Sequence, residues 1–600
     1  MTFEDIYFWY GKKEKECTAI TEALKKKIYV TGTVRLLLIA GMVVTLIVLK
    51  GYSWGIMALA AALFMIPFII LVVYQEKLSA RKRYMETLGL LCRNELKALD
   101  YDFSAFDGAN DRVNVAHRFS FDLDIFGERS LFQSLNRTVT HGGREKLISV
   151  FQEPLSLKKE ILERQVAVKE LSQVPDIRQD FYVTGNIGRG GRNDIDLLKS
   201  LADRPVYFSG SVIWNILMWM IPLLWMAVIP LTIYGYINMA FANIFLCISI
   251  LLCMLRTTKA AGLRSSADKM DKILSVYSKL MKIAESGNFE SEYIKDIKNR
   301  LTSDGKTASH TVMQLSRLLQ DMDKRSNMFV MILDLFTLLD VRIYIRIERW
   351  KKENLGYMQG WFDALADFDA CLSMAGFAFN HPDYIYPDIT DEYFNMSGKG
   401  LGHPLLDRKV CVKNDISIEK SPSFMIVTGA NMAGKSTYLR TVGVNFMLAC
   451  TGMPVFADEL SLYPASLVTS LRTSDSLPDN ESYFYAELKR LKAIIDELRA
   501  GGKLFIILDE ILKGTNSVDK QKGSLALLKQ FVLCKTCGII ATHDLLLGSL
   551  QEQYPMYVKN FRFEAEINGD QLTFSYKMLP GIARNMNAYF LMQKMGIALE

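Results

Sequence analysis

Two long apolar runs near the N-terminus are the first feature of the hydrophobic pattern. They occupy residues 33–50 and 54–74, and no charged residue lies between Lys50 and Glu76. A helix that spans a membrane needs about 20 apolar residues. The second run reaches that length, and the first does so if Arg35 snorkels to the membrane surface. Because only a short turn separates the runs, we predict a transmembrane hairpin, whose polar lead is too long for a cleavable signal peptide.

A second block without charge lies in the middle of the chain. No Asp, Glu, Lys or Arg occurs between Arg204 and Arg256, which leaves room for two spans at about 211–233 and 236–255. Several Trp and Tyr residues in the block suit the membrane interface. The alternative, a buried pair of core helices, is disfavoured because soluble cores rarely exclude charge over such a length. We therefore predict a second transmembrane hairpin over residues 206–256.

Basic residues set the expected orientation of the hairpins. Three lysines at 25–27 precede the first span, Arg81 follows the second, and Arg256 follows the fourth, whereas the connecting turns carry almost no basic residues. Cytoplasmic flanks of membrane spans are enriched in Lys and Arg. The chain is thus expected to be a multi-pass protein of the cytoplasmic (inner) membrane. Both termini and both large polar parts would then lie in the cytoplasm.

The polar parts of the chain show two different periodicities. Charge-rich stretches with helical spacing of apolar residues flank the second hairpin, and from residue 396 short apolar strands alternate with helices such as 435–450. The predicted organisation is an N-terminal segment with the first hairpin (1–84), the first part of a helical core (85–205), the second hairpin (206–256), the second part of the core or lever (257–395) and an α/β domain (396–600).

A phosphate-binding motif opens the α/β domain. Residues 424–439 read FMIVTGANMAGKSTYL, which contains G-x-x-x-x-G-K-[ST] between an apolar strand and a helical pattern. The glycines let backbone N–H groups turn toward phosphate oxygens, and the helix N-terminus adds positive charge. Lys435 is expected to reach the β- and γ-phosphates, and the Ser436 hydroxyl to bind Mg²⁺. The predicted nucleotide-binding residues are Gly429, Asn431, Gly434, Lys435, Ser436 and Thr437.

Two later strands end in candidate catalytic residues. An apolar run from Leu504 ends at Asp509 and Glu510, and another ends at His543. Ligands of parallel sheets collect at the carboxyl ends of the strands. Asp509 is expected to complete the Mg²⁺ shell with Ser436, and Glu510 to act as general base on water. A lone histidine after a strand is more often structural, but its place third in this series favours catalysis for His543, beside Glu510 and Lys435.

These segments resemble the MutS family of mismatch-repair ATPases. The resemblance rests on TGANMAGKST, ESYFYAEL, LDEILKGTNSVD and ATHD in this order, on GHPLL at 402–406 and on FSYKMLPG at 574–581. Residues 124–140 and 362–369 resemble parts of the family's helical core. The similarity covers roughly 118–165 and 355–600. It implies an ABC-type P-loop ATPase domain with a doubly wound sheet, attached to a mainly α-helical MutS-like core.

The resemblance also implies partners. ATP and Mg²⁺ are the expected cofactors and a homodimer the expected assembly, with Ser482 of one subunit contacting the ATP of the other. From the residues alone, Ser482 could equally be an ordinary helix N-cap. Two departures stand out: Ala430 and Ala433 replace a usual Pro and Gly, and residues 410–412 lack the aromatic that stacks on adenine. No N-terminal mismatch-reading domain is recognised in the sequence, and apolar stretches occupy its expected place.

Charge and cysteine content narrow the function only modestly. A net charge of +6 over 600 residues does not by itself indicate a nucleic-acid binder. Nine cysteines without regular spacing favour a reducing compartment, and the pair Cys534 and Cys537 reads as packing residues near the sheet.

Three functions remain open at this level. The first is a membrane-anchored MutS-like ATPase that works as a dimer and engages DNA. The second is an ATP-driven scaffold at the membrane without a nucleic-acid substrate. The third, a half-transporter of the ABC type, is disfavoured because no Leu-Ser-Gly-Gly-Gln signature precedes Asp509 and the spans are few.

Overall fold

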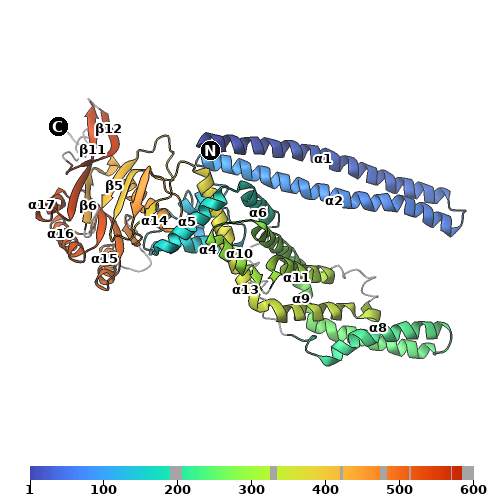
Figure 1. Ribbon diagram of the computed structural model, residues 1–600. Coiled ribbons are helices and arrows are strands. Elements are labelled where there is room, and N and C mark those ends of the chain that lie inside the picture. Colours follow the sequence, from blue (N-terminus) through green and yellow to red (C-terminus); the bar gives the residue numbers. More distant parts are fainter. Residues whose placement is uncertain are drawn as a thin grey trace.

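The computed structural model describes residues 1–188, 206–303, 305–323, 334–418, 423–472, 483–512, 515–568 and 571–583. Figure 1 shows three parts in a row. An α/β part lies at one end, a helical core lies in the middle, and two helical hairpins project from the core on the side away from the α/β part. The order of these parts in space differs from their order in sequence, because the chain leaves the core twice to form the hairpins.

The first hairpin consists of α1 (Phe3–Val48) and α2 (Trp54–Leu99), which pack against each other along their length. Thr2 caps α1 through a reciprocal hydrogen-bond pair with Asp5. Near the core the hairpin buries side chains such as Cys17 and Cys92, whereas toward the tip its leucines are largely exposed. Both helices contain a stretch long and apolar enough to cross a membrane, by length and composition.

The second hairpin consists of α8 (Val212–Ile233) and the first part of α9 (Met239–Ser286). α8 is also long and apolar enough to cross a membrane, whereas the apolar stretch of α9, Met239–Met254, is shorter. The helix α9 continues without a break into the core. The expected boundaries at 84/85 and 256/257 therefore fall inside α2 and α9, so each hairpin shares a helix with the core instead of joining it through a linker.

The core is helical, as its periodicity predicts. Its elements are η1 (Asn110–Arg112), α3 (Leu131–Leu135), α4 (His141–Gln152), α5 (Lys158–Ser172), α6 (Pro175–Ile187), α10 (Glu292–Arg300), α11 (Ala308–Asp323) and α13 (Leu339–Asn380), with a small hairpin of β1 (Thr302–Ser303) and β2 (Lys306–Thr307). Asp369 of α13 accepts hydrogen bonds from the backbone N–H groups of Val139 and Thr140 and from the Thr140 hydroxyl. The two core segments that resemble the MutS family thus contact each other.

A buried ion pair fastens the first hairpin to the core. The guanidinium of Arg137 binds the carboxylate of Glu95 on α2 through two contacts of 2.5 and 3.1 Å. Asn380, the last residue of α13, donates a further hydrogen bond to Glu95 over 2.9 Å and accepts one from Tyr10 of α1 over 3.0 Å. A buried carboxylate needs such partners to offset its desolvation. The base of the hairpin is therefore fixed to the end of α13.

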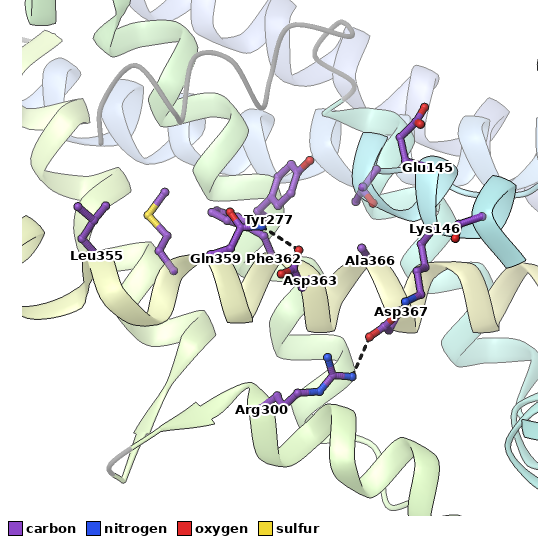
Figure 2. A pocket seen from close by; sticks show the side chains of 14 residues that line it. Glu145, Lys146, Tyr277, Arg300, Leu355, Gln359, Phe362, Asp363, Ala366 and Asp367 are labelled. Carbon is purple, nitrogen blue, oxygen red and sulfur yellow. Dashed lines mark hydrogen bonds and ion pairs between the residues drawn. The ribbon is translucent and has the colours of Figure 1, made fainter. Parts of the chain in front are cut away.

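The long helix α13 connects the second hairpin with the α/β part. Near its start, the Arg342 guanidinium donates to the carbonyl oxygen of Met218 in α8 over 2.8 Å. Farther along, Asp367 forms ion pairs with Lys146 of α4 over 2.9 Å and Arg300 of α10 over 2.8 Å. Figure 2 shows these groups at one end of a cavity of about 730 Å³ that opens beside Tyr277 and Phe362. One continuous helix, α13, thus contacts α8 of the second hairpin as well as α4 and α10 of the core.

The α/β part is built on a six-stranded sheet in the order β12-β11-β6-β10-β9-β8. Neighbouring strands are parallel except for β12, which is antiparallel to β11. The strands are β6 (Ser423–Gly429), β8 (Ser466–Ser470), β9 (Leu504–Asp509), β10 (Cys537–Thr542), β11 (Val558–Asn568) and β12 (Gln571–Pro580). A second sheet, in the order β3-β7-β4-β5, is formed by β3 (Asp388–Ile389), β4 (Met396–Leu401), β5 (Asn414–Ile418) and β7 (Glu459–Leu462).

Alternation along the central strands places helices on both faces of the large sheet. Met425 and Val427 of β6 face the core side, where α14 (Lys435–Cys450) packs, and Phe424 and Ile426 face the other side. There the strands meet α15 (Tyr483–Arg499) and α16 (Ser517–Leu533). Short η3 (Asn431–Ala433), η5 (Leu545–Ser549) and α17 (Leu550–Gln553) complete the part. The α/β architecture expected after residue 396 is confirmed, and no disulfide joins the nine cysteines, all of which are described.

Candidate functional site

The glycine loop lies between β6 and α14. β6 is wholly buried, and it ends at Gly429, whose φ is +145°. A Cβ atom at Gly429 would lie 2.5 Å from the carbonyl oxygen of Phe563 in β11. Gly434 has a φ of +105° and directly precedes the helix. Both positions require glycine, because a side chain would clash or strain the backbone, and together they turn the chain so that the N-terminus of α14 faces the loop.

Lys435 and Ser436 begin α14 and point to different partners. Lys435 is only 1% exposed, and its ammonium donates to the carbonyl oxygens of Gly429 over 2.6 Å and of Ala430 over 3.0 Å. The Ser436 hydroxyl donates to Asp509 Oδ2 over 2.5 Å, across 73 residues of sequence. The two residues predicted to bind a metal are therefore in direct contact. Thr437 follows with an exposed side chain.

Glu510 and His543 meet at the carboxyl ends of β9 and β10. Parallel pairing aligns Asp509 with Ala541, and the Glu510 N–H continues the ladder by donating to the Ala541 carbonyl over 2.9 Å. His543 Nε2 pairs with Glu510 Oε1, and Nδ1 lies 3.0 Å from the carbonyl oxygen of Gly429. Glu510 itself has a φ of +49°, a left-handed conformation that costs about 1 kcal/mol for a residue with a side chain. Such strain is common where a backbone must aim a functional group.

The candidate catalytic and metal-binding residues therefore gather at one sheet edge. The loop, Lys435, Ser436, Asp509, Glu510 and His543 come from three neighbouring strands and one helix. In the part of the chain that the structure describes, no group of three or more His, Cys, Asp or Glu side chains forms a metal cage. One carboxylate and one hydroxyl instead fit Mg²⁺, which keeps several waters and takes few protein ligands. Ser482 and the side chain of Asn431 lie outside the described residues, and α15 is described from Tyr483 onward.

An aromatic residue near the loop was missed by the sequence reasoning. A Cβ atom at Gly434 would lie 3.1 Å from Tyr576 Cδ1, so the tyrosine ring of β12 is close to the loop while its side chain remains 46% exposed. Tyr576 stacks on Phe574, with ring centroids 6.0 Å apart, and its backbone φ is +52°. In the sequence Tyr576 stands only within the FSYKMLPG segment that resembles the MutS family. Its approach to Gly434 depends on how β11 and β12 fold back over the loop.

A second group missed by the sequence reasoning links the loop helix to the core. Arg440 of α14 lies 3.6 Å from the carboxylate of Asp124, and Arg472 binds the same carboxylate over 2.5 Å. Neighbouring Asp122 is buried and accepts hydrogen bonds from Thr469 over 2.7 Å and from the Arg472 backbone over 3.0 Å. Burial, followed by the charge of Arg472, lowers the pKa of Arg440. The start of the helical core thus contacts the helix that follows the phosphate loop.

His403 lies in the same junction. Burial lowers its pKa to about 4, and Arg440 contributes in the same direction. The N–H of Leu405 donates to His403 Nδ1 over 3.2 Å, so this nitrogen is an acceptor. His403 is therefore a neutral, structural histidine that holds the lead-in segment 402–406.

Comparison with known proteins identifies two family models in the chain. The model of MutS domain III matches residues 116–500, more than half of the chain, and the model of MutS domain V matches residues 425–594, which include the glycine loop, Asp509, Glu510 and His543. The chain is 30% identical over 235 residues to MutS protein homolog 4 of Mus musculus, covering 38% of this chain and 24% of that protein. It is 29% identical over 223 residues to DNA mismatch repair protein MutS of Thermotoga maritima, covering 36% and 27%, respectively. The matched stretch thus spans about a quarter of the length of these relatives.

Proposed function

Because this chain belongs to the MutS family, we propose that it is an ATPase that hydrolyses ATP to ADP and phosphate, as a homodimer anchored in a membrane. The observation that carries the proposal is the meeting of the glycine loop, the Ser436–Asp509 pair and the Glu510–His543 pair at one sheet edge. A loop-helix phosphate site, a metal pair and a base are the parts that phosphoryl transfer to water requires. On this proposal the α/β part has the ABC-type P-loop fold.

The loop residues bind and neutralise the phosphates. Lys435 now donates to the carbonyls of Gly429 and Ala430, and turning its ammonium to phosphate oxygens exchanges neutral acceptors for charged ones. Ser436 and Asp509 would hold Mg²⁺, which neutralises phosphate charge when bound. Tyr576 lies beside Gly434 and offers an aromatic face for the adenine base, in place of the aromatic that residues 410–412 lack.

Glu510 takes the proton of the attacking water, and His543 positions Glu510. Glu510 directly follows Asp509 in the sequence. Its carboxylate would therefore lie next to the terminal phosphate, which Mg²⁺ held by Ser436 and Asp509 would contact. His543 contacts both the base and the loop carbonyl of Gly429. Movement of the loop on phosphate binding would therefore alter how His543 holds Glu510. This arrangement couples hydrolysis to correct occupation of the loop.

A second subunit completes the site in this proposal. ABC-type sites bind the γ-phosphate near their own surface, and family resemblance assigns Ser482 to the partner's ATP. In the sequence Ser482 directly precedes α15, and the N-terminus of a helix favours phosphate. The homodimer, and with it the role of Ser482 in trans, rests on the family resemblance.

The hairpins anchor the protein in the cytoplasmic membrane in our proposal. Three of the described helices have the length and composition to cross a membrane, and their apolar side chains are exposed in the monomer. Residues 3–32 of α1 precede the expected span, and at 1.5 Å per residue they make a stalk of about 45 Å. The basic flanks favour a cytoplasmic location for both termini and the ATPase part. Figure 1 supports a common membrane plane, because both hairpins point away from the α/β part.

We propose two candidate outputs of ATP hydrolysis. The relatives favour a mismatch-repair-related role in which the helical core engages DNA. The second candidate is an ATP-driven scaffold without a nucleic-acid substrate, and it is favoured by one observation: α13 leads from the α/β part to α8, which is apolar and largely exposed. In both cases α13 would carry the movement of the ATPase part to the second hairpin.

The test uses full-length protein purified in detergent. ATP turnover that requires Mg²⁺ and is lost in Lys435→Ala is the expected result, with Lys529→Ala as the matched control on α16. Binding of matched and mismatched duplex is measured across a salt series, with and without ATP. Because no mismatch-reading domain was recognised in the sequence, we expect less than about tenfold preference for a mismatch, roughly 1.4 kcal/mol. A larger preference for the mismatched duplex would favour direct mismatch sensing. If no DNA binding is detected at any salt concentration, the scaffold function is favoured.

A further inference from the structure

A basic pocket lies between α11 and α13 on the side of the core that carries the second hairpin. It encloses about 630 Å³, and its lining includes Lys306, His310, Arg317, Arg346 and Arg349. Arg317 and Arg346 are exposed and come from the two facing helices. Trp350 and Leu318 supply apolar wall. Four permanent positive charges thus converge on one hollow.

The charges of this pocket are poorly balanced. Among the residues the structure describes, Glu353 is the one carboxylate in the lining. No ion pair involves Lys306, Arg317 or Arg346 within the described part of the chain. Surface arginines elsewhere in the core do have carboxylate partners, as in Arg300 with Asp296 over 3.0 Å and Arg112 with Glu145 over 2.6 Å. The pocket is therefore suited to an anion that brings the missing charge.

The position of the pocket indicates where that anion comes from. Arg349 donates to Asn215 Oδ1 over 3.0 Å, and Asn215 lies in the first turn of α8, the apolar helix that begins at Val212. The side chains of Val212 and Ile213 are exposed on that same turn. The pocket therefore sits level with the point where α8 would enter the membrane from the cytoplasm, the depth at which phosphate headgroups lie.

We propose that the pocket of Lys306, Arg317, Arg346 and Arg349 binds the phosphodiester headgroup of an anionic membrane lipid. This inference rests on the proposed membrane anchoring. Guanidinium groups bind phosphate oxygens in a bidentate manner, and two arginines on facing helices can hold one headgroup from both sides. The acyl chains of the lipid would then lie along the exposed start of α8. Since α11 and α13 both line the pocket, lipid binding would join the lever helices to the membrane surface.

Fluorescence titration tests the lipid preference. Full-length protein in a neutral detergent is titrated with fluorescent phosphatidylglycerol or fluorescent phosphatidylcholine. We expect the protein to prefer phosphatidylglycerol. The double variant Arg317→Gln/Arg346→Gln should lose about tenfold in apparent affinity for it, because each basic residue near an anionic surface contributes substantially. The matched control is Lys492→Gln/Arg499→Gln, which removes the same charge from the exposed surface of α15 and should leave the preference unchanged.

Further arms identify the source of the phosphate and guard against misfolding. Arg317→Lys/Arg346→Lys keeps both charges but loses the bidentate guanidinium geometry, so it should recover part of the affinity that the glutamine variant loses. Competition by inorganic phosphate as effective as by lipid would overturn the proposal in favour of a soluble ligand. If the double variant binds a short DNA duplex more weakly than the wild type does but binds phosphatidylglycerol equally well, the pocket is a nucleic-acid site and the proposal is overturned. If the control variant loses as much affinity for phosphatidylglycerol as the double variant does, net charge alone explains the effect, and the proposal is again overturned.

Flotation separates this proposal from the anchoring on which it rests. Protein is reconstituted with vesicles of phosphatidylcholine alone and of an equimolar mixture with phosphatidylglycerol. Wild-type protein that floats with neither vesicle contradicts the membrane anchoring itself. Protein that floats with both, and whose double variant binds fluorescent phosphatidylglycerol as the wild type does, leaves the anchoring intact and contradicts only the headgroup site.

Discussion

His543 and Glu510 form a pair at the ends of neighbouring strands, and the same imidazole faces the glycine loop. Its Nδ1 is 3.0 Å from the carbonyl oxygen of Gly429, and its Nε2 contacts Glu510 Oε1. His543 therefore contacts both the candidate base and the loop that would hold phosphate.

Glu510→Gln should bind ATP and hydrolyse it at least about 100-fold more slowly, because an amide cannot accept the proton of water. Nucleotide binding and single-turnover hydrolysis measure the two effects separately. Glu564→Gln, a change in β11 at a carboxylate that pairs with Arg562, serves as the control. Wild-type turnover in the Glu510 variant would remove it from the role of general base.

Tyr576→Ala should raise the KM for ATP about fivefold or more with little change in kcat, since base–aromatic stacking contributes about 1–3 kcal/mol. Tyr576→Phe should behave as the wild type, because it keeps the ring. Steady-state kinetics with ATP and with a triphosphate that lacks a base make the comparison. If Tyr576→Ala raises the KM for both triphosphates equally, the ring supports the loop and does not stack on the base.

Ser482→Ala should keep ATP binding and lose much of the hydrolysis. When these subunits are mixed with Lys435→Ala subunits, one composite site receives an intact loop from one subunit and an intact Ser482 from the other. Activity above that of either variant is expected, measured after mixed dimers are isolated through two affinity tags. A mixture no more active than its components would speak against contact in trans.

Single cysteines introduced into a cysteine-free background should report the orientation of the hairpins. Position 51, where an added Cβ atom meets nothing within 4 Å, and the exposed Tyr236 both lie in the hairpin turns. They should react with a membrane-impermeant maleimide on intact cells, whereas Arg81→Cys and Asp180→Cys should react only after permeabilisation. Outside labelling at position 180 would be incompatible with two hairpins entering from the cytoplasm.

Stability should fall as the pH is lowered from 7 to 5. Burial lowers the pKa of His381 to about 3 and that of His403 to about 4, each next to a positively charged arginine. An unfolded histidine has a pKa of about 6.5, so between these values the unfolded chain binds more protons and folding loses free energy as the pH falls. Each residue should contribute about 2 kcal/mol to the loss by pH 5.

Thermal unfolding in detergent at both pH values measures this loss. His403→Gln should weaken the pH dependence of stability, whereas the control variant His310→Gln, at an exposed position, should leave it unaltered. An equal slope in all three proteins would mean that other groups account for the pH dependence.

Several features of this protein follow from its sequence because they depend on local spacing alone. The phosphate motif needs glycines and a Lys-Ser-Thr start to a helix in fixed order, and α14 extends over Lys435–Cys450 as expected. The strands that end at Asp509 and before His543 are continuous apolar runs. The long stretches without charge predict helices of sufficient length to cross a membrane, since that requirement is also local.

Contacts between distant segments were decided only by the tertiary structure. The approach of Tyr576 to Gly434, of Asp124 to Arg440 and of Arg349 to Asn215 each joins residues more than a hundred positions apart. No periodicity in a single chain encodes such pairs, because they depend on sheet order and on where helices cross. The expected domain boundaries at 84/85 and 256/257 fall inside α2 and α9 for a related reason: an apolar span and a polar core helix can form one continuous helix, and helical structure continues through both boundaries.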